Sequence, residues 1–407
     1  MPVSISSWKQ HVDNSAIWLH NIHMWIKRNA EELIINLGRQ FPAVFVTGAR
    51  QTGKTSILTH LFPDYSYVTL DDPDMAEEAI NSPHDFIGSL NKPVIIDEAQ
   101  YAPGLFRHIK LTIDKSKRSG QFFLTGSQSF QLMQNLSESL AGRCAIVNLQ
   151  PLSAHELQRA NRLTSVEDYI GTGGFPALYA DMNRHHWYPS YISTYLERDV
   201  RNIMRVGSLR DFNRFLRAAA IRTAQTLSFV DLSRDVGVSP NTIKAWVSAL
   251  EASHMVCLLE PYHRSLGKRL VKSPKLYFLD TGLAAHLMGL YSWDEIANTP
   301  MAGALWETYA FSQIQRYLFS QGLTNPPLYY WRTREGREID FIIEKGGQFI
   351  AIEAKLTGVP APPKGFKYFE NYYGENAILK GYIVCRVKND HAITPEVKAI
   401  NGVCFDF

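Results

Sequence analysis

Residues 48–55 read Gly48-Ala49-Arg50-Gln51-Thr52-Gly53-Lys54-Thr55 and follow directly on the apolar run Ala43-Val44-Phe45-Val46-Thr47. This run is short, rich in β-branched and aromatic residues and preceded by Pro42, which predicts a buried parallel strand. Gly48 and Gly53 allow the backbone to wrap tightly and to aim its N–H groups at an anion. We expect a helix from about Lys54 to His60, with its positive N-terminal end at the same point.

A strand, a glycine-bounded loop ending in Gly-Lys-Thr and a helix together form a phosphate-binding loop. Lys54 is expected to contact the β- and γ-phosphates, and the Thr55 hydroxyl to bind Mg²⁺. The sequence therefore predicts a site for a nucleoside triphosphate, with ATP and Mg²⁺ as cofactors. Its nucleotide-binding residues are Gly48, Ala49, Arg50, Gln51, Thr52, Gly53, Lys54, Thr55 and Ser56.

The composition is that of a globular protein, with 45% hydrophobic and 20% charged residues among 407. A chain of this length is expected to fold as two to four domains. No apolar run approaches the ~20 residues that span a bilayer, and no signal-peptide core is evident, so we expect a cytoplasmic protein without a membrane partner. The cysteines are scattered at positions 144, 257, 385 and 404 and show no zinc or redox spacing.

Further strands are expected near residues 65–70, 93–98 and 121–125. The strand near 93–98 ends in Asp97-Glu98, the pattern of a Walker B element. Asp97 is expected to hold the Mg²⁺ shell, and Glu98 to polarise the water that attacks the γ-phosphate. The alternative for this pair is an ordinary acidic strand end.

Ser127 and Arg143 are candidates for two further roles at the nucleotide. Ser127 follows the strand at 121–125 and is expected to contact the γ-phosphate, unless it only forms a turn. Arg143 precedes a strand at 145–149 and is expected to reach the γ-phosphate of a neighbouring subunit, which implies a homo-oligomer. The alternative for Arg143 is a local surface ion pair.

The alternation of strands and helices predicts an α/β fold with a doubly wound parallel sheet and ATP at its C-terminal edge. We expect four domains: the ATPase core at 1–150, a helical lid at 151–210, a winged helix-turn-helix at 211–280 and an α/β domain at 281–407. In the lid, Ser153 and Glu156 form a capping-box pattern at the start of a helix.

Residues 211–280 contain three short helical patterns and two short strand patterns, the order of a winged helix-turn-helix. Between residues 205 and 275 there are twelve basic and five acidic residues, a local net charge of +7 against +3 for the chain. The basic residues Arg264, Lys268, Arg269, Lys272 and Lys275 fall on the expected wing, where they could meet phosphates. The alternative is a module that only braces its neighbours.

Two C-terminal strands, at 338–343 and 348–355, are joined by Gly346-Gly347 and predict a hairpin. Glu353 and Lys355 are two residues apart and share a face, with Asp340 opposite. Such a triad predicts a Mg²⁺-dependent nuclease site, with Glu307 completing the metal shell. The Glu-x-Lys pattern alone carries little weight, because Glu396-Val397-Lys398 also matches it. A silent inherited fold and a salt-bridged hairpin are the alternatives.

The order of these motifs resembles a prokaryotic family of AAA+-related P-loop ATPases with a winged helix and a C-terminal restriction-endonuclease-like domain of unknown function. The resemblance extends from about Trp25 to the end and rests on the following segments: residues 48–55, 96–100, 124–127, 140–143, 173–176 and 195–200, and Asp340 with residues 353–355. It implies that Lys54, Thr55, Asp97 and Glu98 bind and hydrolyse ATP. The C-terminal triad resembles a nuclease signature, but membership does not imply cleavage.

Two functions follow from this sequence. The first is an ATP-dependent enzyme acting on nucleic acid, with DNA as the expected partner and a nuclease site at Asp340, Glu353 and Lys355. The second is a non-cleaving switch whose ATP state controls binding to DNA or to a protein.

Overall fold

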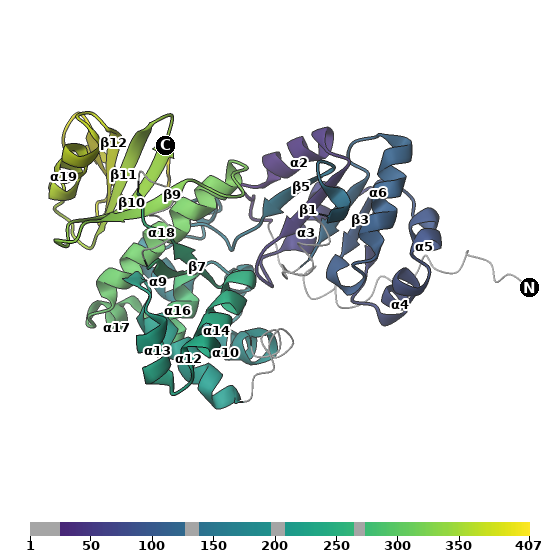
Figure 1. Cartoon of the computed structure of the whole chain (residues 1–407), viewed down its shortest axis with the longest axis horizontal. Helices are drawn as coiled ribbons and strands as arrows, with labels where there is room; N and C mark the ends of the chain where they lie inside the picture. Colours follow the sequence, from purple (N-terminus) through teal and green to yellow (C-terminus); the bar gives the residue numbers. More distant parts are fainter. Residues whose placement is uncertain (1–24, 127–137, 197–207, 264–272) are drawn as a thin grey trace, which may run out of the picture.

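The computed structural model describes residues 25–126, 138–196, 208–263 and 273–407. Two sheets stand at opposite ends of the molecule, and a group of helices lies between and below them (Figure 1). No helix in the described ranges has an apolar stretch long enough to cross a bilayer.

The N-terminal sheet has five parallel strands in the order β2-β3-β4-β1-β5. Every residue of β1, β3 and β4 is buried, as expected for strands with helices on both faces. The α/β fold and the parallel sheet predicted from the sequence are confirmed. The strands are β1 (Ala43–Thr47), β2 (Ser66–Thr69), β3 (Val94–Asp97), β4 (Phe122–Thr125) and β5 (Cys144–Asn148), and the helices are α2 (Glu31–Gln40), α3 (Lys54–Leu61), α4 (Pro73–Asn81), α5 (Pro83–Ser89) and α6 (Leu105–Ser116).

The helices between the two sheets begin at α8, where Ser153 and Glu156 form the predicted capping box. Further along the chain, after α9 and α10, come α12, α13 and α14. The last of these starts at Pro240 with Ser239 as its cap. A small antiparallel sheet in the order β6-β8-β7 closes this group. The elements are α8 (Ala154–Arg159), α9 (Val166–Thr172), α10 (Arg184–Tyr191), α12 (Leu209–Ile221), β6 (Gln225–Thr226), α13 (Phe229–Val236), α14 (Pro240–Ala252), β7 (Val256–Leu259), β8 (Lys275–Phe278), α16 (Thr281–Leu287) and α17 (Trp293–Ala297).

The C-terminal domain is built on a mixed sheet in the order β13-β14-β12-β11-β10-β9, with the long helix α18 beside it (Figure 1). The predicted hairpin is present: β10 pairs antiparallel with β11, with Phe341 opposite Ile352. The elements are α18 (Ala302–Ser320), β9 (Leu328–Arg332), β10 (Glu338–Lys345), β11 (Gln348–Lys355), α19 (Lys364–Tyr373), β12 (Ile378–Cys385), β13 (His391–Ala392) and β14 (Val397–Ile400).

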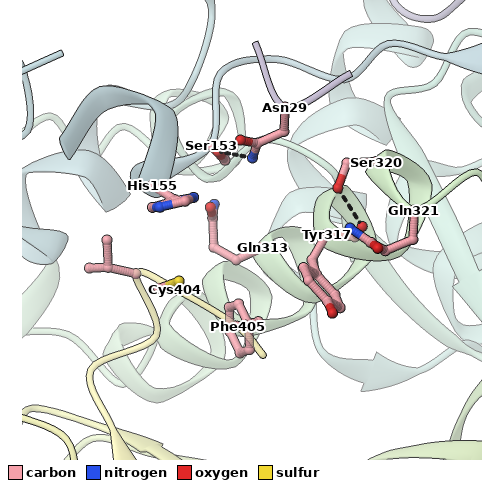
Figure 2. A pocket seen from close by; sticks show the side chains of 10 residues that line it. Asn29, Ser153, His155, Gln313, Tyr317, Ser320, Gln321, Cys404 and Phe405 are labelled. Carbon is pink, nitrogen blue, oxygen red and sulfur yellow. Dashed lines mark hydrogen bonds between the residues drawn. The ribbon is translucent and has the colours of Figure 1, made fainter. Parts of the chain in front are cut away.

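The ATPase end and the C-terminal domain meet across a small polar pocket of about 170 Å³ (Figure 2). Asn29, Ser153 and His155 line one side, and Gln313 of α18 lines another. The Gln313 side-chain oxygen accepts a hydrogen bond from the backbone N–H of Ala154 at 2.9 Å. The start of α8 is therefore fixed to α18.

A buried polar cluster around Asp280 holds the helical group together. Its carboxylate accepts hydrogen bonds from the Gly174 N–H at 2.7 Å and from the Tyr188 hydroxyl at 2.9 Å. The guanidinium of Arg316 lies 3.7 Å from the same carboxylate. The cluster thus joins the Gly-Gly turn after α9 to α10, α16 and α18.

Replacing Gly173 by alanine is expected to destabilise the protein by about 2 kcal/mol more than replacing Gly289. Both glycines have left-handed backbones, at φ +80° and +77°. A Cβ at Gly173 would lie 2.2 Å from the Asp280 carboxylate, whereas at Gly289 it would meet no atom within 4 Å. Urea unfolding midpoints of the two variants test this, and equal midpoints would contradict it.

Candidate functional site

The phosphate-binding loop connects β1 to α3, as predicted. Gly48 and Gly53 adopt positive φ angles of 146° and 89°. A Cβ at Gly48 would lie 2.1 Å from the carbonyl oxygen of Leu149, just beyond β5. Glycine is therefore required at Gly48 by both its backbone angle and its neighbour.

Lys54 is buried at the start of α3 and turns back into the loop. Its ammonium donates hydrogen bonds to the carbonyl oxygens of Gly48 at 3.3 Å and of Ala49 at 2.9 Å. The Thr52 hydroxyl donates to the Ala49 carbonyl at 3.0 Å. The remaining predicted nucleotide-binding residues, Arg50, Gln51 and Ser56, lie in the same loop and first helical turn.

Asp97, at the end of β3, is the centre of a buried hydrogen-bonded group beside this loop. Its carboxylate accepts from the Thr55 hydroxyl at 2.8 Å and from the Tyr67 hydroxyl at 3.1 Å. The Thr125 hydroxyl, at the end of β4, also donates to Asp97. A hydroxyl and a carboxylate held together are the oxygen ligands that Mg²⁺ prefers, so these residues fit Mg²⁺–ATP.

Glu98 follows Asp97 in a left-handed backbone conformation, with φ of 54°. Burial raises the pKa of its carboxyl, and the nearby Gln100 amide and Lys54 ammonium oppose that rise. The Gln100 amide donates a hydrogen bond to the Glu98 carboxylate. Glu98 is thus within electrostatic reach of the lysine that is expected to meet the phosphates.

The strand β4 lies between β1 and β3, the position from which a polar residue can reach the γ-phosphate. The predicted residue, Ser127, lies outside the described residues, so its role stays a prediction. Thr125 occupies the described end of β4. Besides contacting Asp97, its hydroxyl accepts a hydrogen bond from the Glu98 N–H at 3.2 Å. Thr125 therefore connects the Asp97 carboxylate to the backbone of Glu98.

Arg143 lies at the N-terminal end of β5, whereas the phosphate-binding loop follows the C-terminal end of the parallel strand β1. Its guanidinium pairs with Asp114 of α6 at 2.6 Å. Arg143 accordingly faces away from the nucleotide loop of its own chain. Its role toward a neighbouring subunit stays a prediction and would require the Asp114 pair to open.

The C-terminal triad comes together as predicted. Asp340 of β10 and Glu353 of β11 are both buried, and the Ala354 N–H donates to Asp340 at 2.8 Å. The Lys355 ammonium lies 2.6 Å from the Glu353 carboxylate and 3.7 Å from that of Asp340. These residues line a pocket of about 710 Å³, together with Glu307, Glu338 and Lys275.

Crowding of carboxylates in this pocket changes their ionisation. Burial and the neighbouring Asp340 raise the pKa of Glu353 to about 8 and that of Glu307 to about 7. Burial opposes the charge of Lys355, but Asp340 and Glu353 outweigh it and raise the lysine's pKa. An accumulation of acidic groups with shifted pKa values is characteristic of functional sites and of structural ion-pair networks.

Lys275 was expected on the basic wing, and this expectation is wrong. It is 3% exposed and pairs with Glu307 at 2.9 Å and also with Glu338. Because β8 begins at the pocket, its first residue is buried against α18 and β10. The other wing residues named above lie outside the described residues.

Glu307 lines the predicted pocket, but its carboxylate is engaged by Lys275 and by the Tyr277 hydroxyl at 2.5 Å. Among the described residues, no three acidic, histidine or cysteine side chains form a group that could hold a metal by itself. Asp340 and Glu353 are two carboxylates beside the same Lys355 ammonium. Mg²⁺ commonly takes one or two protein carboxylates and completes its shell with water and phosphate oxygens, so this pair fits it.

Three family models match the chain. An AAA domain matches residues 40–158, which contain the phosphate-binding loop and the Asp97 cluster. The domains of unknown function DUF8612 and DUF4143 match residues 163–294 and 302–404.

The uncharacterized protein Rv2008c of Mycobacterium tuberculosis is 30% identical over 340 residues, covering 82% of this chain and 75% of the relative. The chain belongs to this family of AAA ATPases. The uncharacterized protein MJ1544 of Methanocaldococcus jannaschii is 22% identical and covers 73% of this chain and 71% of its own length. A Walker-type ATPase of Pyrococcus abyssi is similar in structure, with a TM-score of 0.44, 16% identity and coverage of 63% of this chain and 94% of that one.

Several residues at the two sites of this AAA ATPase were missed by sequence reasoning. Tyr67 and Thr125 reach Asp97 from neighbouring strands, and Lys275 and Glu338 enter the C-terminal pocket. Glu338 lies on β10, the strand of Asp340, and Lys275 lies on β8 of the small sheet, whereas Tyr67 and Thr125 lie on β2 and β4, the strands on either side of β3. Strand order, which places them there, has no local signal, although the polar ends of the strands at 65–70 and 121–125 could have drawn attention to them.

In metal-free buffer, the unfolding free energy of the parent is expected to fall as the pH rises. Replacing Glu353 by glutamine is expected to remove the contribution of this residue to that fall. The folded state keeps the Glu353 proton up to about pH 8, whereas an unfolded glutamate loses it near its ordinary value. The unfolding free energy should therefore fall by about 1.4 kcal/mol per pH unit between about pH 5.5 and 7.5, owing to this one group. The variant should lack this contribution.

The measurement is urea unfolding of parent and variant at several pH values with EDTA present. Glu375→Gln, at an exposed position after α19, is the matched control and should keep the slope of the parent. An unchanged slope in the Glu353 variant would contradict the raised pKa.

Proposed function

We propose that this AAA ATPase hydrolyses ATP with Mg²⁺ and acts on nucleic acid, most directly DNA, through its C-terminal pocket. The observation that carries the proposal is the pairing of Asp340 and Glu353 beside Lys355 in an open pocket, in the same chain as a complete nucleotide site. Carboxylates with an adjacent lysine suit a metal-assisted attack on a phosphodiester.

In the ATPase core, Lys54 would move from the Gly48 and Ala49 carbonyls to the β- and γ-phosphates. Thr55 and Asp97 would hold Mg²⁺, which neutralises phosphate charge when bound. Glu98 would accept a proton from the attacking water, since burial raises its pKa and makes it a stronger base. The Thr125 hydroxyl would hold the Asp97 carboxylate and the Glu98 backbone in position.

In the C-terminal pocket, Asp340 and Glu353 would hold Mg²⁺, a Lewis acid for a phosphodiester. Lys355 would place its ammonium beside the charge that develops on phosphorus. The surrounding pairs of Lys275 with Glu307 and Glu338 would keep the pocket's shape.

One observation favours a second function, that of a non-cleaving switch. The helices α12, α13 and α14 with the sheet β6-β8-β7 have the order of a winged helix-turn-helix, and Asn241, Lys244 and Ser248 on α14 are exposed. Such a module could bind the DNA backbone in a nucleotide-dependent way. It predicts affinity that falls steeply with salt and no strand scission.

The test combines ATP turnover and strand scission in the full chain. The parent is expected to bind and hydrolyse ATP and to cut at least one form of DNA or RNA in Mg²⁺ or Mn²⁺. Lys54→Ala should lower nucleotide affinity about a hundredfold, because it removes a charged partner of two phosphates. An exposed-lysine variant, Lys115→Ala on α6, is the control and should bind like the parent.

The outcomes separate the two functions. Scission that requires the metal supports the nuclease. Salt-dependent DNA binding without scission supports the switch. If neither occurs while ATP turns over, a protein partner remains as the target of the ATPase.

A further inference from the structure

A histidine from outside the ATPase core lies at the end of β5, the strand beside the one that leads into the phosphate-binding loop. His254 sits in the turn between α14 and β7, with a left-handed φ of 54°. It is 9% exposed, and its Nδ1 lies 3.4 Å from the side-chain nitrogen of Asn148, the last residue of β5. His254 thus joins the three-helix module (α12, α13 and α14) to the C-terminal edge of the ATPase sheet.

The hydrogen bonds around His254 determine which of its nitrogens carries the proton. The Asn148 side-chain oxygen accepts from the Gln150 amide at 2.7 Å, so the Asn148 nitrogen is the atom that faces His254. That nitrogen is a donor, and His254 Nδ1 must therefore be the acceptor. In a neutral imidazole, Nε2 then carries the hydrogen and is a donor.

This Nε2 donor is buried and has no hydrogen-bond partner within the described structure. Burial and the nearby Lys54 ammonium lower the pKa of His254 to about 4, so the ring is neutral at physiological pH. A buried donor without an acceptor is unfavourable, and such groups in native proteins call for a specific explanation. Here the charged group that acts on the ring is Lys54, which belongs to a loop built to hold an anion.

A second contact from outside the core supports the same arrangement. The Tyr191 hydroxyl, at the end of α10, donates to the Arg50 carbonyl in the phosphate-binding loop at 3.4 Å. The sulfur of Met255, the residue after His254, lies 3.8 Å from that hydroxyl. The turn at residues 254–255 therefore contacts the end of β5 through His254 and is connected to the phosphate-binding loop through Tyr191.

We propose that the Nε2–H of His254 donates a hydrogen bond to a phosphate oxygen of the nucleotide in the loop. This contact would make the three-helix module sense whether the phosphate site is filled. The inference rests on the proposed ATP binding and adds a residue to that site from a different part of the chain. It identifies His254 as a nucleotide-contacting residue that links ATP binding to the candidate nucleic-acid module.

Two substitutions of His254 test the roles of its two ring nitrogens separately. His254→Asn keeps a polar group near the Nδ1 position and suits the left-handed backbone, but has no atom at Nε2. His254→Gln places an amide N–H near the Nε2 position. Isothermal titration with ADP and with a non-hydrolysable ATP analogue is expected to show affinity lowered about tenfold to a hundredfold in His254→Asn and mostly kept in His254→Gln.

The control variant is His84→Asn, an exposed histidine on α5 that should bind like the parent. A second measurement needs no substitution: ADP should slow hydrogen–deuterium exchange of residues 253–259 in the parent. Parental affinity in His254→Asn, or unchanged exchange of this segment in the parent with ADP bound, would overturn the inference while ATP binding stands. If the parent binds no nucleotide, both the His254 inference and the proposed ATP binding are overturned.

Discussion

Replacing Glu98 by glutamine is expected to lower the rate of ATP hydrolysis about a hundredfold to ten-thousandfold while ATP still binds. The change removes a proton acceptor but keeps the shape and the hydrogen-bonding capacity of the side chain. Lys54, Thr55 and Asp97, which are expected to hold the nucleotide, stay in place. The measurement pairs steady-state phosphate release with direct titration of an ATP analogue.

The structure gives Glu98 features that suit a base. It is held by Gln100, and its backbone N–H is held by the Thr125 hydroxyl, so its position is set from two sides. Burial raises its pKa, which strengthens it as a proton acceptor. Glu77→Gln, at an exposed position on α4, is the matched control and should turn over ATP at the parental rate. Full turnover by Glu98→Gln would show that another group activates the water.

Local sequence signals predicted the elements that depend on neighbouring residues. The strand at 43–47 and the Ser153–Glu156 capping box both match the structure. Each is determined within one or two turns of chain. Backbone geometry and capping act over that range, so the pattern alone was sufficient.

The residues that were missed depend on strand order and on how the domains pack. His254 contacts Asn148 because α14 ends beside β5, and Lys275 is buried because β8 lies against α18. Neither position carries a pattern of its own. The C-terminal triad was predicted because its members lie on one hairpin. The two side chains that engage Glu307, Lys275 and Tyr277, come from β8, 32 and 30 residues away in sequence.

In the C-terminal pocket, Asp340→Ala and Lys355→Ala are each expected to lower any metal-dependent strand scission by about a thousandfold or more. Asp340→Ala would remove a metal ligand, and Lys355→Ala would remove the cation that lies beside both carboxylates. The assay follows nicking and linear cleavage of several DNA and RNA forms in Mg²⁺ and in Mn²⁺. ATP turnover, measured on the same preparations, should be unchanged because the ATPase residues are untouched.

The chain supplies its own control for the Glu-x-Lys pattern. Lys398 of β14 stands two residues after Glu396, but it is half-exposed and pairs with Asp390 at 3.6 Å, outside the pocket. Lys398→Ala should therefore cleave like the parent. If Lys355→Ala and Lys398→Ala cleave equally, the pattern has no catalytic meaning here, and the pocket is a structural ion-pair network. If Lys355→Ala loses scission and Lys398→Ala keeps it, the scission is assigned to the Asp340–Glu353 pocket. Both lysines follow a glutamate by two residues, but only Lys355 lies in that pocket.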